Sequence, residues 1–195
     1  MSTIDYYNNN AKKYFDSTYD ADMSEQYEVF LHYVKRDGKI LDFGCGSGRD
    51  SLYFKNKGYN VTAIDGSEEM CKLAREYTGL DVRCMDFMDF NDIDCYDGVW
   101  ACASLVHVNK NNFLEVLKKL RDSLKDSGYM FVALKNGTGE EVTEEGRYYN
   151  YLNFSDVEKL ASDSNLEIVT VYMSKSVNNP NEEKYWNNFV LKKIK

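Results

Sequence analysis

Residues Ile40-Leu41-Asp42-Phe43-Gly44-Cys45-Gly46-Ser47-Gly48 run from a short apolar segment into three glycines spaced G-x-G-x-G. A segment of helix length follows the third glycine. Glycine suits a sharp turn at which a ligand approaches the backbone, because it has no Cβ and tolerates a positive φ. The pattern predicts a nucleotide-binding turn between a strand and a helix.

A carboxylate follows this turn at the spacing that is typical of a ribose contact. Asp65 ends a second apolar segment, Val61-Thr62-Ala63-Ile64, and lies about 20 residues after the first glycine. An acidic side chain there accepts hydrogen bonds from ribose hydroxyls. Asp65 therefore predicts a ribonucleoside cofactor.

The residues after the turn indicate which kind of cofactor. A dinucleotide fingerprint reads G-x-G-x-x-G, whereas here the third glycine comes one residue earlier and Arg49-Asp50 follows. Asp50 would repel an anionic pyrophosphate. A zwitterionic amino-acid tail tolerates Asp50 and can place its carboxylate on Arg49.

The segment from residue 40 to residue 65, together with Met85-Asp86-Phe87, resembles motifs I, II and III of the class I S-adenosylmethionine-dependent methyltransferases. The resemblance is nearest to the small bacterial tellurite-resistance and ubiquinone-biosynthesis-like branches, and its motifs cover residues 38–136. It implies S-adenosyl-L-methionine as the cofactor. It also implies methyl transfer by in-line displacement to a small-molecule acceptor, which the sequence does not identify.

Apolar segments alternate with helix-length patterns, which favours a parallel α/β fold. Strands are expected at residues 39–43, 60–64, 81–85, 95–101, 129–134, 166–172 and 186–192, and helices at 51–57, 67–77, 111–124 and 155–162. The family pattern implies a Rossmann-like sheet of seven strands in the order 3-2-1-4-5-7-6. Strand 7 is expected to be antiparallel, with helices on both faces.

One methyltransferase domain is expected over residues 1–195, because 43% of the residues are hydrophobic and can bury one core of ordinary size. Its parts are expected to be an N-terminal helical cap (1–37), a cofactor-binding core (38–136), a lid loop (137–154), and a C-terminal helix with an antiparallel strand pair (155–195). In the cap, Ile4, Tyr7, Ala11 and Tyr14 have helical spacing.

The resemblance assigns a set of residues to the cofactor. Asp42 would steady the glycine loop and reach the amino group of the cofactor through water, or it would serve as a cap instead. Asp86 would accept from the adenine amino group, and Tyr14 would meet the methionine tail. Met70 fits either the adenosine or the core, and Asp86 could instead be a solvated loop carboxylate. The full expected set is Tyr14, Asp42, Gly44, Cys45, Gly46, Gly48, Arg49, Asp65, Gly66, Ser67, Met70, Met85, Asp86, Phe87 and Ala101.

The acceptor is expected just beyond the fourth strand, since ligands of open α/β sheets bind outside the carboxyl ends of the strands. His107 lies there and is the candidate catalytic residue, as a general base or as a neutral hydrogen-bonding group. The alternative is that His107 caps or packs under the helix that starts near Asn109. Ser104, His107, Arg147 and Tyr148 are the candidate substrate contacts.

Composition narrows the partners. The chain has 24 basic and 32 acidic residues, a net charge of −8, which disfavours nucleic acid. The five cysteines include no C-x-x-C pair and are expected to be reduced thiols. The two histidines have no partner at the spacing of metal ligands, so no metal site is expected.

The sequence has no apolar run near the ~18 residues of a membrane span, and no signal peptide is recognised. We therefore expect a cytoplasmic protein without a membrane partner. It is expected to be a monomer or a dimer.

Three alternatives to a small-molecule methyltransferase remain open at this point. A nicotinamide or flavin oxidoreductase would share the fold and Asp65, but it would bind a pyrophosphate at Gly48. A methyltransferase that acts on RNA or protein would need a docking surface, which the negative charge makes harder for RNA. A regulator would bind S-adenosylmethionine without catalysis.

Overall fold

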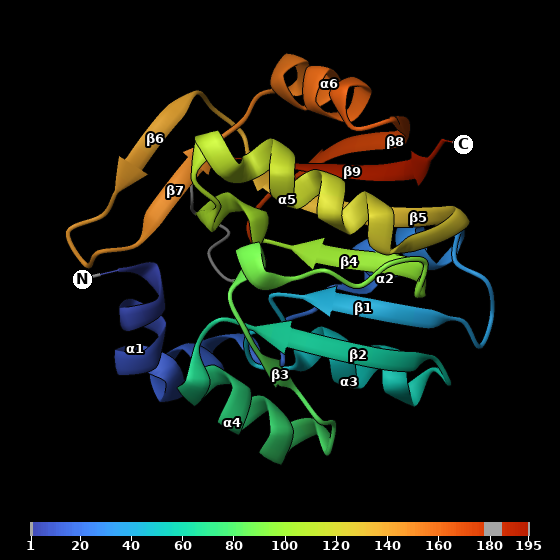
Figure 1. The fold of residues 1–195 in the computed structure, drawn as a ribbon. Helices are drawn as coiled ribbons and strands as arrows, with labels where there is room; N and C mark the ends of the chain where they lie inside the picture. Colours follow the sequence, from blue (N-terminus) through green and yellow to red (C-terminus); the bar gives the residue numbers. More distant parts are fainter. Residues whose placement is uncertain (1, 178–184, 195) are drawn as a thin grey trace.

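A computed structural model of the chain describes residues 2–177 and 185–194 (Figure 1). The chain alternates between strands and helices, as its apolar pattern predicts. The elements are α1 (Thr3–Thr18), α2 (Ser24–Leu31), β1 (Lys39–Phe43), α3 (Arg49–Asn56), β2 (Asn60–Asp65), α4 (Glu68–Thr78), β3 (Arg83–Cys84), η1 (Phe87–Asp89), β4 (Tyr96–Cys102), η2 (Leu105–His107), α5 (Lys110–Ser123), β5 (Leu124–Lys135), β6 (Gly139–Val142), β7 (Tyr148–Tyr151), α6 (Phe154–Asp163), β8 (Leu166–Ser174) and β9 (Trp186–Lys193).

Seven of the strands form one sheet in the order β3-β2-β1-β4-β5-β9-β8. The first five are parallel, and β9 is antiparallel to both of its neighbours, β5 and β8. Counted along the sheet-forming strands alone, this is the order 3-2-1-4-5-7-6. The predicted fold class and topology are therefore confirmed.

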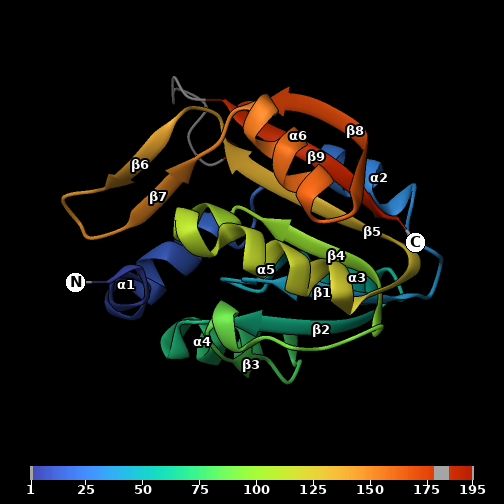
Figure 2. The same ribbon diagram turned by 45° about the horizontal axis from the view of Figure 1, so that its top comes forward.

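The two faces of the sheet carry different apolar clusters, because successive strand residues point to opposite faces. Leu41 and Val99 face a cluster that α5 and α6 complete, whereas Ile40 and Trp100 face a cluster completed by α2 and α3. Figure 1 shows α5 in front of the sheet with α2 and α3 behind it, and Figure 2 shows α5 and α6 together on one side. Helices therefore cover both faces of the sheet, and the carboxyl ends of the central strands are left to form the site.

The glycine turn joins β1 to α3 and is held by the neighbouring strand. The backbone N–H groups of Gly44 and Cys45 both donate to the carbonyl oxygen of Ile64, at 2.9 Å each. Gly48 has a φ of +82° and precedes the first helical residue, Arg49. The predicted strand, turn and helix are thus present at the predicted place.

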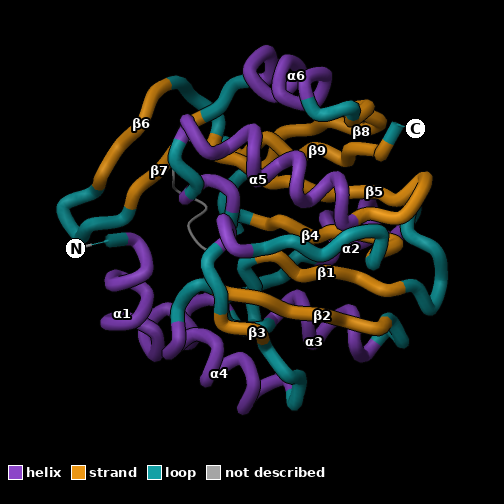
Figure 3. The backbone as a smooth tube through the Cα atoms, viewed as in Figure 1, coloured by secondary structure: helices purple, strands orange, loops and turns teal. Residues whose placement is uncertain are grey.

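Several element boundaries differ from the sequence-based expectation. The strand expected at 81–85 is reduced to Arg83–Cys84, and Leu124 begins β5 rather than ending the preceding helix. Helix α2 had no periodic signal of its own. Residues expected to form a lid loop instead form the antiparallel hairpin β6–β7, which pairs Gly139 with Tyr151 and stands apart from the main sheet (Figure 3).

Gly48→Ala is expected to destabilise the protein. An added Cβ would lie 2.7 Å from the Thr78 methyl group while the residue keeps a φ of +82°, so backbone strain and a clash with α4 act together. We expect a loss of about 1–3 kcal/mol in the free energy of unfolding, measured with urea. Gly139→Ala is the matched control, because its φ is +87° but no described atom lies within 4 Å of the added Cβ. Equal losses in the two variants would contradict the packing argument.

Candidate active site

Two cavities meet at the carboxyl ends of the central strands. The larger has a volume of about 270 Å³ and lies between the ends of β1, β2 and β4 and helix α1; the smaller has a volume of about 100 Å³ and lies on the other side of the glycine turn. Both are lined by Tyr14, Gly44, Gly46, Cys102 and Ala103. One elongated ligand can therefore extend from one cavity into the other.

Most of the predicted cofactor residues line the larger cavity. Apart from Tyr14 of α1, they come from the glycine turn, the end of β2, the first turn of α4 and the segment after β3, which the parallel strands bring to one edge. The set is Tyr14, Gly44, Gly46, Asp65, Gly66, Ser67, Met70, Asp86 and Phe87. Cys45 and Arg49 line the smaller cavity.

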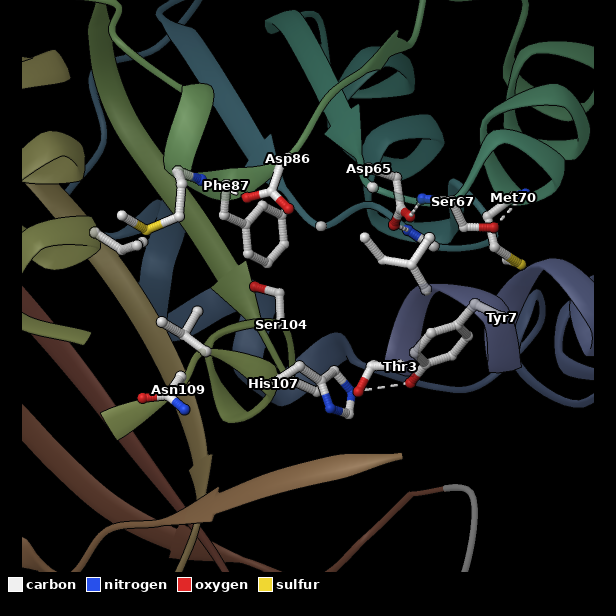
Figure 4. Close-up of a pocket in the computed structure, with 18 of the residues that line it drawn as sticks. Thr3, Tyr7, Asp65, Ser67, Met70, Asp86, Phe87, Ser104, His107 and Asn109 are labelled. Atoms are coloured by element: carbon white, nitrogen blue, oxygen red, sulfur yellow. Dashed lines mark hydrogen bonds between the residues drawn. The ribbon is translucent and has the colours of Figure 1, made fainter. Parts of the chain in front are cut away.

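The Asp65 carboxylate is fixed by two backbone donors, as Figure 4 shows. The N–H of Gly46 donates to one oxygen and the N–H of Ser67 to the other, each at 2.9 Å. Burial raises the pKa of Asp65, and the backbone donors partly offset that effect. Each oxygen keeps acceptor capacity that it can offer to the cavity.

Asp86 and Phe87 form another wall of the larger cavity. Asp86 caps the short helix η1 by accepting from the N–H of Met88 at 2.7 Å, and its side chain remains exposed. The Phe87 ring stacks on Phe43 with centroids 4.2 Å apart. The predicted adenine-binding segment thus presents a carboxylate beside an aromatic face that the core supports.

Ser104 carries an orphaned polar atom in this cavity. Its side chain is 5% exposed, and its hydroxyl has no hydrogen-bond partner among the described residues. Figure 4 shows the hydroxyl directed toward the Phe87 ring. A buried hydroxyl without a partner costs about 1–3 kcal/mol, so this atom is available to a polar group of a ligand. This places the predicted residue Ser104 in the larger cavity.

The smaller cavity is built around a buried ion pair. Two guanidinium nitrogens of Arg49 donate to the two oxygens of Asp50, at 2.6 and 3.0 Å. Asp50 also accepts from Tyr27 at 2.5 Å and from the Trp100 indole at 2.7 Å. Burial would raise the pKa of Asp50, but the Arg49 charge and these donors hold it below its usual value.

Four predicted cofactor residues do not line either cavity. Asp42 is buried and accepts from the Ser51 hydroxyl at 2.5 Å, and burial and the nearby Asp50 charge raise its pKa to about 8. This bond ties the end of β1 to α3, whereas the predicted contact of Asp42 with the cofactor stays a prediction. Gly48 packs against α4, Met85 packs on the core, and Ala101 is fully buried in it. Cys102 and Ala103, which follow Ala101, line both cavities in its place.

His107 is held between two hydrogen bonds rather than directed freely at a substrate. Its Nδ1 lies 2.7 Å from the carbonyl oxygen of Tyr148, which can only accept, so Nδ1 carries the proton. Its Nε2 therefore accepts from the Tyr7 hydroxyl at 2.9 Å (Figure 4). Burial lowers the pKa of His107 to about 4, with the Arg147 and Lys135 charges adding to the effect. His107 is thus neutral at pH 7.

These bonds join helix α1 to the hairpin β6–β7 above the larger cavity. The Tyr148 N–H donates to the Thr3 hydroxyl at 2.9 Å, and the Arg147 guanidinium lies 4.5 Å from the centre of the Tyr6 ring. Helix α1 is also bonded on the opposite side of the cavity, where Asn8 accepts from the Ser67 hydroxyl at 2.7 Å. Helix α1 is therefore fastened on both sides of the cavity that it covers.

The candidate substrate residues Arg147 and Tyr148 lie in the hairpin β6–β7 and do not line either cavity. The Tyr148 hydroxyl donates to Glu140, and Arg147 pairs with Glu145. Sequence reasoning missed Thr3 and Ile4 in the larger cavity and Lys175 and Trp186 in the smaller one. The helical stripe that contains Ile4 and Tyr7 was the available signal for α1. No local pattern indicated Lys175 or Trp186, because the ends of β8 and β9 come near the glycine turn only in the folded chain.

Among residues 2–177 and 185–194, no cluster of three or more histidine, cysteine, aspartate or glutamate side chains could hold a metal ion. None of the helices in these ranges is both long and apolar enough to cross a membrane.

Comparison with known proteins agrees with this geometry. A family model described as a methyltransferase domain matches residues 40–128. An uncharacterized methyltransferase of Staphylococcus carnosus is 28% identical over 149 residues, which are 72% of each chain. The ubiquinone biosynthesis O-methyltransferase of Caulobacter vibrioides is 35% identical over 107 residues, which are 51% of this chain and 41% of that protein.

A solved structure shares the fold. The 1,6-didemethyltoxoflavin-N1-methyltransferase of Burkholderia thailandensis, determined with 1,6-didemethyltoxoflavin and S-adenosylhomocysteine, superposes with a TM-score of 0.78 at 19% identity and covers 98% of this chain and 85% of its own. At 19% identity this likeness shows the fold alone, whereas the sequence matches support the class I S-adenosylmethionine-dependent methyltransferases as the family of this chain. The predicted family, enzyme class and cofactor are confirmed.

The low pKa of His107 predicts a pH-dependent stability. Its folded pKa of about 4 lies below the ordinary value of 6.5, so the neutral form stabilises the fold fully above pH 6.5 and this contribution is lost as the pH falls from 6.5 toward 4. The loss amounts to at most about 3 kcal/mol. Urea unfolding at pH 7 and pH 4 should therefore show a smaller pH effect in His107→Gln than in the natural protein. His32→Gln, which removes the other histidine, is the control and should keep the natural pH effect; the same pH effect in His107→Gln would contradict the assignment.

Proposed function

We propose that the chain transfers the methyl group of S-adenosylmethionine to a small-molecule acceptor by in-line displacement. The observation that carries the proposal is the meeting of two cavities at the glycine turn, one beside the Asp65 carboxylate and one beside Arg49. When bound, S-adenosylmethionine supplies an electrophilic methyl group on a sulfonium sulfur. The residues present fit such a molecule, since Ser104 offers an unpaired buried hydroxyl and the turn offers glycines in place of side chains.

The larger cavity is assigned to the nucleoside. Asp65 would accept from the ribose hydroxyls, Asp86 would accept from the adenine amino group, and Met70 with Phe87 would flank the ring. The arrangement supports this assignment because the carboxylates and the apolar side chains line the same cavity. Ionised acceptors form the stronger class of hydrogen bond, so Asp65 is expected to contribute most to recognition.

The smaller cavity is assigned to the methionine tail. The Arg49 guanidinium lines it and is oriented by Asp50, so its remaining N–H groups can meet a carboxylate. Tyr14 lines both cavities and would lie beside the sulfur. The acceptor would approach where the cavities meet, with Cys102 and Ala103 as the floor.

The protein contributes placement and exclusion of water more than acid–base chemistry. An acceptor aligned with the sulfur–carbon bond gains most of its rate from proximity and orientation. Helix α1 covers the larger cavity and keeps water from it. His107 positions Tyr7 in this cover; a nitrogen with a pKa of about 4 that already accepts a proton donor is a poor general base.

A small molecule is preferred over RNA as the acceptor, because the net charge of −8 opposes binding to a polyanion. The regulator alternative is weaker because the second cavity extends past the tail site to solvent-exposed residues such as Lys175 and Val177. A cytoplasmic location remains a prediction.

Asp65→Asn is expected to weaken binding of S-adenosylmethionine and S-adenosylhomocysteine by roughly 10- to 100-fold, because an amide loses charge-assisted bonds worth about 1.5–3 kcal/mol. Calorimetric titration measures the effect. Asp89→Asn is the matched control, since this exposed carboxylate lies in the same segment as Asp86 but does not line either cavity. Unchanged affinity in Asp65→Asn, or binding of NAD in preference to both sulfur nucleosides, would contradict the assignment.

Tyr7→Phe is expected to loosen the cover. The substitution keeps the ring but leaves His107 Nε2 buried without its donor, which costs about 1–3 kcal/mol. If α1 must close to retain the cofactor, S-adenosylhomocysteine should dissociate about tenfold faster, as stopped-flow fluorescence would show. Tyr6→Phe removes a hydroxyl from the adjacent residue of the same helix and serves as the control. The same dissociation rate in Tyr7→Phe and the natural protein would show that this bond does not hold the cover.

A further inference from the structure

The smaller cavity contains a buried carboxamide that the rest of the protein does not bond. Gln26 of α2 lines this cavity and is only 4% exposed. Its side chain has no hydrogen-bond partner within residues 2–177 and 185–194. A buried polar group without a partner is destabilising, and such groups are uncommon in folded proteins. Gln26 therefore has the character of a group that a ligand completes.

The first turn of α2 holds Gln26 against the cavity. Met23 caps the helix and also lines the cavity, and residues three apart lie on the same face of a helix. The next residue, Tyr27, donates to Asp50 at 2.5 Å and so fastens α2 to the start of α3. The position of Gln26 is thus fixed by its neighbours on both sides.

Asp50, the carboxylate of this cavity, has no acceptor capacity left. One of its oxygens accepts from Arg49 at 2.6 Å and from Tyr27 at 2.5 Å. The other accepts from Arg49 at 3.0 Å and from the Trp100 indole at 2.7 Å. A carboxylate offers about four lone-pair sites, and these four donors fill them. A cationic group in the cavity must find another acceptor.

Donors, in contrast, remain available. The Arg49 guanidinium bonds Asp50 and meets the Thr18 carbonyl oxygen at 3.5 Å, which leaves further N–H groups on its terminal nitrogens. Ser47 is buried in the same lining and can donate its hydroxyl proton. A carboxylate placed here therefore has partners, whereas an ammonium group beside it has no ionised one.

The neutral side chains of the lining differ in what they can offer. Asn188 uses its amide nitrogen within the sheet, where it donates to the Ser174 hydroxyl at 2.9 Å and to the Tyr172 carbonyl oxygen at 3.4 Å. Gln26 has both its carbonyl oxygen and its NH₂ group free. A carboxamide of this kind matches a zwitterion, because it can accept from a cation.

We propose that Gln26 recognises the amino-acid tail of the cofactor, with its Oε1 accepting from the ammonium group beside the carboxylate that Arg49 binds. Hydrogen bonds with one ionised partner are the stronger class, so a neutral acceptor is sufficient. This role rests on the proposed function, which assigns the smaller cavity to the methionine tail. Gln26 then makes the protein prefer S-adenosyl nucleosides with an intact amino acid over nucleosides without it.

Calorimetric titration of the natural protein and of Gln26→Met tests the role. The ligands are S-adenosylhomocysteine, its analogue without the amino group, and 5′-methylthioadenosine, which lacks the whole tail. We expect Gln26→Met to weaken S-adenosylhomocysteine about tenfold, the loss of one charge-assisted bond, and to leave the other two affinities unchanged. Glu28→Met places the same side chain at an exposed position of α2 outside both cavities, and it should bind all of these ligands like the natural protein.

Thermal unfolding separates recognition from packing. Without ligand, Gln26→Met should melt no lower than the natural protein, because the substitution removes a group that makes no bond. A lower melting temperature with equal losses for all ligands would assign Gln26 to packing and overturn its role. Unchanged affinity for S-adenosylhomocysteine, or a loss that persists with the analogue without the amino group, would overturn it as well.

These results differ from a failure of the proposed function. If the natural protein bound none of the nucleosides, the proposed function would fail, and the role of Gln26 with it. If the natural protein bound S-adenosylhomocysteine and Gln26→Met bound it equally well, only the role of Gln26 would fail.

Discussion

The buried Asp50 carboxylate is the constraint on which the site depends. It accepts from the first residue of α3, from Tyr27 of α2 and from Trp100 of β4, so three elements meet at one anion. A buried carboxylate is strongly destabilising unless donors surround it, and these donors can all reach it only when α2 packs under the sheet and α3 starts directly after the glycine turn. The same bonds fix the orientation of Arg49 and the floor of the smaller cavity.

Charge is distributed unevenly about the glycine turn. The larger cavity, which we assign to the nucleoside, carries Asp65 and Asp86, which suit hydroxyl and amino donors. The smaller cavity carries the Arg49 guanidinium paired with Asp50, and burial keeps His107, in the larger cavity, neutral. A histidine of this kind joins helix α1 to the hairpin without adding charge to the site.

Local patterns in the sequence were sufficient to predict the centre of the fold. The G-x-G-x-G turn, Asp65 and the alternating strands each depend on a few consecutive residues, and all are found where they were expected. Ser67 caps α4 through the N–H of Met70, which is also a local contact between residues three apart. The sequence therefore predicted many of the residues that line the larger cavity.

The remaining contacts around the site could not be predicted, because they join distant parts of the chain. Tyr7 and His107 are 100 residues apart, and nothing in either segment indicates their hydrogen bond. Lys135 and Trp186 become neighbours only through the antiparallel register of β5 and β9. The hairpin was read as a loop since its polar first strand, Gly139–Val142, is exposed at every residue and has no buried face to produce an alternating pattern.

A crystal structure of the protein with S-adenosylhomocysteine tests the central claim most directly. The account predicts the adenosine in the larger cavity with its ribose hydroxyls on Asp65, the amino-acid tail across Gly44 and Gly46 beside Arg49, and the sulfur between the two cavities. A nucleoside bound elsewhere, or a tail that leaves the smaller cavity empty, would contradict it.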